Sequence, residues 1–239
     1  MMMVFGIVVA GGSGTRMGFP KQYARLANQP MWLRSIRALQ AGGIHECWLV
    51  APQVDVSTLE QACVTGQMER PIRVIAGGTT RAQSVKNGVD DVLAEAATRG
   101  LTPSNVLVAI HDAARPFVSP SDVAAAVQAG MTYGAVLLGQ PCVDTMKRVI
   151  AGQVQETVPR EDLWHAQTPQ VFRGDWLQQA YGLVKVLQEM TDEATMLEKL
   201  GYPLHIVAAT EYNAKVTTQS DLEIAYWLAE RRWGSANSE

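Results

Sequence analysis

The chain has 239 residues, of which 47% are hydrophobic and 18% charged, and its formal net charge at pH 7 is −3. This length allows one substantial hydrophobic core, or one domain with an added arm. The small net charge argues against a general nucleic-acid or membrane-surface binder, because such proteins carry an excess of basic residues.

Short apolar runs alternate with longer helical patterns through the first two-thirds of the chain. This β-α-β-α alternation predicts an α/β fold, a Rossmann-like and mainly parallel sheet with helices on both faces. The expected strands are Val4–Ala10, Glu46–Ala51, Ile72–Ile75, Val106–Ile110 and Ala135–Leu138, and the expected helices are Met31–Ala41, Val56–Cys63, Arg81–Ala97 and Pro120–Ala129.

The alternation ends near residue 140. The segment Pro141–Val158 alternates polar and apolar residues around Gly152, which predicts an extended β-hairpin. A two-stranded ribbon has too small a core to be stable alone, so we expect this arm to pack on a second copy of the chain.

The last third of the chain returns to helical patterns. We expect one α/β domain built from residues 1–140 and 171–234, with the arm, residues 141–170, inserted in it. The expected elements are helices over Asp175–Leu187 and Asp192–Leu200, a strand over Leu204–Ala208, and a closing helix capped by Ser220–Asp221 that ends at Arg231.

A glycine-rich loop follows the first strand, with the sequence Ala-Gly-Gly-Ser-Gly-Thr-Arg-Met-Gly over residues 10–18. Glycine lets backbone N–H groups approach phosphate oxygens closely, so the loop predicts a nucleotide or another polyphosphate. The spacing also fits a dinucleotide loop, but Pro20 follows at once and the second strand ends without an acidic residue. Arg16 and Lys21 suit the negative charge that builds up in phosphoryl or nucleotidyl transfer.

Two further motifs follow predicted strands. Gly77 and Gly78 permit close approach of a ligand ring, and Ser84 on the next helical turn can point back at it, whereas Thr80 is best explained as a helix cap. Asp112 ends a strand, where ligands and metals bind in open α/β sheets, and its carboxylate suits Mg²⁺ held mainly by substrate phosphates. A purely structural pairing of Asp112 with Arg115 remains an alternative.

Other features indicate the compartment. The three cysteines, Cys47, Cys63 and Cys142, are widely spaced and contain no CxxC pair, which predicts reduced thiols rather than a zinc site. No apolar stretch reaches the roughly 18 residues that span a bilayer, and the first residues lack the basic start of a signal peptide. We therefore expect a cytoplasmic protein without membrane or nucleic-acid partners.

Taken together, the motifs resemble those of the 2-C-methyl-D-erythritol 4-phosphate cytidylyltransferase family of sugar-phosphate nucleotidyltransferases. The resemblance implies transfer of CMP from CTP to 2-C-methyl-D-erythritol 4-phosphate, with Mg²⁺ and release of pyrophosphate, by a homodimer. It runs from Val8 to about Asp221 and is carried by Pro20–Tyr23, His111–Pro116, Asp144–Lys147, Trp164–Gln170 and Thr191–Ala194.

The resemblance also implies roles for individual residues. The catalytic set is Arg16, Lys21, Lys215 and Asp112, with Asp112 also the metal ligand. The CTP-binding set comprises the phosphate cradle Ala10, Gly11, Gly12 and Gly14, the cytosine-reading Gly78 and Ser84, and Ala113 near the ribose. The sugar-phosphate set is Arg115, Thr145, Arg160, Thr168 and Thr191, of which Thr145 and Arg160 would reach in from the partner subunit.

Two other functions remain open at this point. Ribitol-5-phosphate cytidylyltransferase is a near relative that shares the Ala10-Gly11-Gly12 variant of the loop, although Ala113-Ala114 and Asp144–Lys147 favour methylerythritol phosphate. The second alternative is a nicotinamide-dependent oxidoreductase that would use the glycine spacing of the opening loop.

Overall fold

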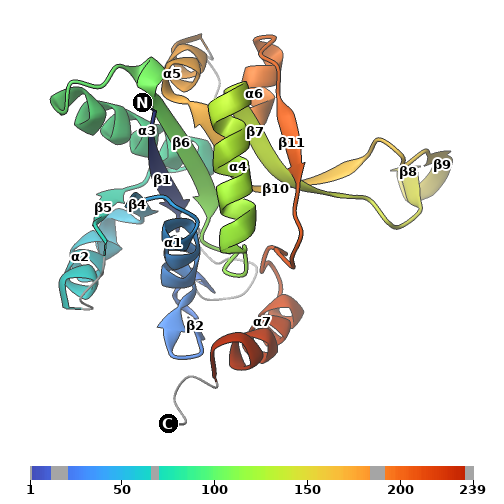
Figure 1. Ribbon diagram of the computed structural model, residues 1–239. Coiled ribbons are helices and arrows are strands. Elements are labelled where there is room, and N and C mark those ends of the chain that lie inside the picture. The colour runs from blue at the N-terminus through green and yellow to red at the C-terminus, as the bar shows by residue number, and fades with distance from the viewer. Residues whose placement is uncertain (1, 12–20, 66–69, 184–191, 235–239) are drawn as a thin grey trace.

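The computed structural model describes residues 2–11, 21–65, 70–183 and 192–234. In these ranges a seven-stranded sheet has the order β11-β7-β10-β6-β1-β4-β5 (Figure 1). Six of its strands run in the same direction, and β10 runs antiparallel to its neighbours β6 and β7. The strands are β1 (Met3–Val9), β4 (Glu46–Ala51), β5 (Ile72–Ala76), β6 (Val106–Asp112), β7 (Ala135–Pro141), β10 (Trp164–Arg173) and β11 (His205–Ala208).

Helices cover both faces of this sheet, as the alternating pattern predicts. Side chains of β1 point alternately to the two faces, Val8 into one core cluster and Ile7 and Val9 into the other. The first cluster lies under α1 (Met31–Ala41), α2 (Val56–Thr65) and α4 (Pro120–Tyr133), and the second under α3 (Arg81–Thr98), α5 (Gly174–Leu183) and α6 (Glu193–Lys199).

A third, smaller cluster joins the closing helix α7 (Gln219–Trp233) to the short β2–β3 hairpin (Arg25–Leu26 and Gln29–Pro30). Single-turn 3₁₀ helices complete the described elements, namely η1 (Lys21–Tyr23), η2 (Gln53–Asp55) and η3 (Pro103–Asn105). None of the helices in the described ranges is long and apolar enough to cross a membrane.

Helix starts agree with the sequence pattern at two places and differ at two. Thr80 caps α3 by accepting from the Gln83 N–H, and Ser119 caps α4 in the same way ahead of Pro120. The closing helix begins earlier than expected, at a capping box formed by Thr218 and Asp221. At α6 the expected first residue, Asp192, is instead the cap, and its carboxylate accepts from the Thr195 N–H.

The expected hairpin is present as β8 (Met146–Ile150) and β9 (Gln153–Val158), which project from the body of the molecule (Figure 1). Its turn uses Ala151 and Gly152, both with positive φ, as a type I′ hairpin turn requires. Val149 and Val154 form a cross-strand pair and are 52% and 61% exposed. The arm therefore carries apolar side chains that nothing in the described chain covers.

The long strand β10 was not expected from the sequence. Residues 164–170, which the predicted division assigned to the arm, pair with β7 and β6 inside the main sheet. The apolar pattern did not reveal this strand because the stretch is polar and contains Pro169. The peptide bond before Pro169 is cis, and the strand register shifts between Ala166 and Gln170. The division into one domain and an inserted arm otherwise stays a prediction.

Candidate active site

The predicted site lies at the carboxyl edge of the parallel strands, where β1 and β6 neighbour each other. The Ala10 N–H donates to the Val50 carbonyl at 2.8 Å, and the Ala113 N–H donates to the Val9 carbonyl at 3.1 Å. These two bonds extend the sheet's hydrogen bonding to Ala10 and Ala113, at the edge where ligands bind in open α/β sheets. Gly12, Gly14, Arg16 and Thr191 lie outside the described residues, and Lys21 begins η1.

Gly11, Gly77 and Gly78 lie close to Ser84 where β5 meets α3. The Gly78 N–H donates to the Ser84 hydroxyl at 3.1 Å, and that hydroxyl donates to the Thr80 carbonyl at 2.8 Å. A Cβ on Gly77 would lie 2.7 Å from Ser84 Oγ, and one on Gly11 would lie 3.6 Å from it. The structure thus brings together Gly11, Gly78 and Ser84, three residues of the predicted nucleotide site.

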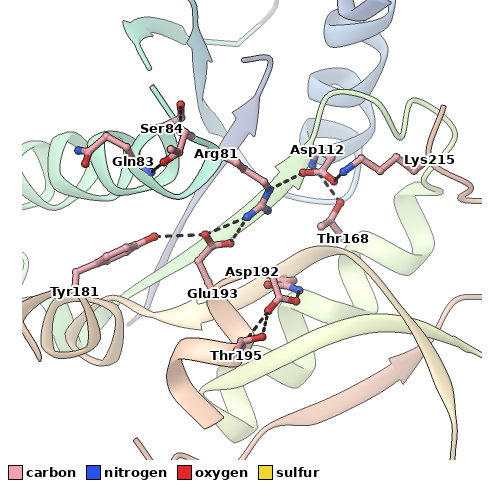
Figure 2. Close-up of polar contacts among 12 residues, drawn as sticks. Arg81, Gln83, Ser84, Asp112, Thr168, Tyr181, Asp192, Glu193, Thr195 and Lys215 are labelled. Atoms are coloured by element: carbon pink, nitrogen blue, oxygen red, sulfur yellow. Dashed lines mark hydrogen bonds and ion pairs between the residues drawn. The ribbon is translucent and has the colours of Figure 1, made fainter. Parts of the chain in front are cut away.

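Asp112 lies at the end of β6 between two cations (Figure 2). Its Oδ2 is 2.7 Å from Lys215 Nζ and its Oδ1 is 3.3 Å from Arg81 Nε. Burial alone would raise the pKa of this carboxyl, but Arg81 and Lys215 hold it well below its usual range. Asp112 is therefore ionised, and the structural pairing with Arg115 is replaced by pairs with Arg81 and Lys215.

Arg81 joins Asp112 to the start of α6. Its Nη1 lies 3.0 Å and 3.2 Å from the two carboxylate oxygens of Glu193, and the Tyr181 hydroxyl lies 3.5 Å from Glu193 Oε1. The Glu193 side chain is only 2% exposed. Neither Arg81 nor Glu193 was assigned to the site from the sequence, although both stand inside motifs that it singled out.

A buried relay supports the backbone beneath Asp112. The Thr168 hydroxyl accepts from the Asp112 N–H at 3.1 Å and lies 2.9 Å from Nδ1 of His111, whose Nε2 lies 3.0 Å from the Arg115 carbonyl. Because a carbonyl only accepts, the histidine proton is assigned to Nε2, and Thr168 donates to Nδ1. Burial lowers the pKa of His111 to about 4, so the ring is neutral.

Arg115 is held beside this relay rather than against Asp112. Its Nη1 donates to the Asn213 carbonyl at 2.7 Å, and its buried Nε has no partner among the described residues. The Asn213 amide donates at 2.9 Å to both Gln167 and the Thr168 carbonyl. The strand β10 and the loop before α7 therefore meet at the same corner as Asp112.

The two arm residues of the predicted site lie elsewhere. Thr145 and Arg160 are exposed, and Arg160 donates to the Val143 carbonyl within the arm. The structure does not bring them to Asp112 in the same subunit. Their role in the site of a partner subunit stays a prediction.

The described residues contain no group of three or more His, Cys, Asp or Glu side chains that could hold a metal ion. Asp112 offers one ionised carboxylate. Mg²⁺ commonly takes one or two carboxylates and completes its shell with water and substrate phosphates, so this donor set fits an ion that arrives with a triphosphate.

The fold and the site together define an α/β nucleotidyltransferase. The family model described as 2-C-methyl-D-erythritol 4-phosphate cytidylyltransferase matches residues 4–231, and the chain belongs to this family. The family resemblance drawn from the motifs is thereby confirmed, and the comparisons give no support to the ribitol-phosphate or oxidoreductase alternatives.

Curated relatives and solved structures agree with this assignment. The chain is 35% identical to the 2-C-methyl-D-erythritol 4-phosphate cytidylyltransferase of Alkaliphilus metalliredigens, over 95% of this chain and 92% of that protein. It is also 35% identical to the enzyme of the same name from Pelotomaculum thermopropionicum, over 98% and 97%. A crystal structure of 4-diphosphocytidyl-2C-methyl-D-erythritol synthase superposes with a TM-score of 0.78 at 29% identity, covering 95% of this chain and 98% of that one.

Proposed function

We propose that this chain transfers the cytidylyl group of CTP to 2-C-methyl-D-erythritol 4-phosphate and releases pyrophosphate. The observation that carries the proposal is the ionised Asp112 with Lys215, at the same sheet edge as the cluster of Gly11, Gly78 and Ser84. Family membership supplies the identities of the two substrates.

The nucleotide would bind across the turns after β1, β5 and β6. Gly78 and Ser84 would read the cytosine with backbone groups and a small hydroxyl, which lie together after β5. Ala113 is small and would leave space for the ribose. The loop from Ala10 through Gly11, Gly12 and Gly14 would surround the phosphates with backbone N–H groups.

The transfer needs no covalent enzyme intermediate. A phosphate oxygen of the sugar substrate attacks the α-phosphorus of CTP in line, and the bond from that phosphorus to the β-phosphate oxygen breaks. A phosphate monoester with a second pKa near 6 is already largely ionised at neutral pH, so no general base is required. Arg16 and Lys21 would stabilise the charge on the α-phosphate.

The sugar phosphate would meet a cationic, hydrogen-bonding wall. We assign Lys215, Arg115, Thr168 and Thr191 to this wall, with Lys215 orienting the attacking phosphate. Asp112 would hold Mg²⁺, which when bound supplies positive charge against the triphosphate. The three cysteines are all free, which suits the reducing cytoplasm that we propose as its compartment.

The arm would complete the site in a homodimer, with Thr145 and Arg160 reaching the partner's substrate. Val149→Asp on the exposed apolar face of the arm is expected to yield monomers with reduced activity, measured by light scattering after size-exclusion chromatography. Val54→Asp changes another exposed valine, in η2, and serves as the control. A Val149→Asp protein that stays dimeric and active would rule out this arm as the interface.

The reaction itself is tested by pyrophosphate release from the purified chain. CTP is supplied with either 2-C-methyl-D-erythritol 4-phosphate or ribitol 5-phosphate, and UTP, ATP and GTP replace CTP in parallel. We expect release with CTP and methylerythritol phosphate only. Release with ribitol 5-phosphate alone would overturn the substrate assignment, and tight binding of NADH in a fluorescence titration would favour an oxidoreductase.

A further inference from the structure

An ion-pair chain runs from Glu193 through Arg81 to Asp112. The proposed reaction gives a role to Asp112 but none to Arg81 or Glu193. Arg81 is the first residue of α3, Glu193 is the first residue of α6, and Asp112 ends β6. These three elements come from distant parts of the sequence, pack around one core cluster, and are joined at their polar ends by this guanidinium (Figure 2).

We propose that Arg81 is a positioning residue for the transfer, and that Glu193 acts only by holding Arg81. The inference rests on the proposed function, since Asp112 matters there as the carboxylate of the site. Arg81 would fix the plane of the Asp112 carboxylate through Nε, so that Oδ2 stays directed at Lys215.

The geometry of the guanidinium supports this role. Nε and Nη1 lie in one rigid plane, and each donates to a different carboxylate. Two fixed contacts at its two ends leave the side chain little freedom to rotate. A lysine ammonium is a single point charge on a flexible stem, so it could contact one carboxylate but could not hold both in one plane.

The burial of Glu193 ties this carboxyl to Arg81. Burial raises the pKa of Glu193, and the adjacent guanidinium opposes that rise. Among the described residues, Arg81 and the Tyr181 hydroxyl lie within hydrogen-bonding distance of the Glu193 carboxylate. A buried ion pair contributes little net stability compared with well-packed apolar side chains. Its clearest consequence is therefore geometric, because it prevents Arg81 from turning away from Asp112 into solvent.

The experiment compares Arg81→Lys and Glu193→Gln with a matched control elsewhere in the fold. Arg73 on β5 also bridges two carboxylates, Asp91 at 3.1 Å and Glu95 at 2.7 Å, and it is exposed and away from the site. Arg73→Lys therefore repeats the same chemical change without touching the transfer site. Pyrophosphate release with CTP and methylerythritol phosphate gives kcat and both KM values, well below each variant's Tm.

We expect Arg81→Lys and Glu193→Gln each to lower kcat about 10- to 100-fold, the usual cost of removing a group that orients a functional ligand. The KM for CTP should change by less than about threefold, because Gly78 and Ser84 are untouched. Arg73→Lys should leave kcat unchanged. The double variant should lose no more than the larger single loss, since Glu193 acts through Arg81.

Three results would overturn the inference. In the first, Arg81→Lys keeps a kcat within about threefold of wild type. In the second, losses multiply in the double variant, which would mean that Glu193 acts independently. In the third, kcat of the variants falls only in proportion to their folded fraction, which circular dichroism measures. If Arg81→Lys does not fold, Glu193→Gln, which keeps the side-chain shape, decides alone. A wild-type chain that releases no pyrophosphate overturns the proposed function, and this inference with it.

Discussion

Replacing Thr168 by valine removes a hydroxyl at nearly constant side-chain volume. In the native structure this hydroxyl serves two buried groups, the Asp112 N–H at 3.1 Å and Nδ1 of His111 at 2.9 Å. Thr168 is 5% exposed and His111 is fully buried. Each buried polar group that loses its partner costs about 1–3 kcal/mol, so we expect the free energy of unfolding to fall by about 2–6 kcal/mol.

Thermal unfolding followed by circular dichroism measures this loss directly. For a chain of this size, 1 kcal/mol corresponds to about 2–4 °C in Tm, which predicts a Tm lower by about 4–24 °C. Thr168→Ser is the matched control, because it keeps the hydroxyl and loses one buried methyl group, at about 1 kcal/mol. If the valine variant proves as stable as the serine variant, the relay beneath Asp112 does not support the fold as described.

Residues in and around the proposed site yield three more predictions. Burial lowers the pKa of His111 to about 4. As the pH falls, this histidine therefore binds a proton near pH 6.5 in the unfolded chain but only near pH 4 in the folded chain. The free energy of unfolding should therefore fall by about 3 kcal/mol between pH 6.5 and 4, and denaturant titrations of His111→Gln should lack that part of the slope. Gly77→Ala places a Cβ 2.7 Å from Ser84 Oγ and should raise the KM for CTP, whereas Gly182→Ala in α5, where a Cβ has open space, should not. Lys215→Met should lower kcat at least tenfold with little change in Tm, because this side chain is 39% exposed and Asp112 keeps Arg81; an unchanged kcat would remove Lys215 from the reaction.

Local sequence signals predicted most of the fold. The bounds of α1 and β4 match the expected Met31–Ala41 and Glu46–Ala51 because apolar periodicity and flanking glycine or proline are properties of adjacent residues. Most of strand β10 was not predicted because three of its buried side chains, Gln167, Thr168 and Gln170, are polar. Each of the three has a side-chain hydrogen-bond partner that is distant in the sequence, namely Asn213, His111 and Asp192 respectively.

The site shows the same difference between local signals and contacts that are distant in the sequence. Motifs and the family resemblance were sufficient to single out Ser84, Asp112 and Lys215. Arg81 and Glu193 have ordinary local explanations, as charged residues on the first turns of two helices. Their ion pair joins positions 112 residues apart, and only the packing of α6 beside α3 and β6 decides that they meet.

The four paired side chains of the proposed site have balanced formal charges. Arg81 and Lys215 carry two positive charges, Asp112 and Glu193 carry two negative charges, and the four are already paired at hydrogen-bonding distance. Such a set is preorganised and needs little rearrangement when substrates arrive, but its formal charges cancel. The positive charge that transfer requires against the triphosphate must therefore come from outside these four side chains. Arg16 and Lys21, after β1, are the predicted protein source, so their replacement should affect the rate of transfer far more than the geometry around Asp112.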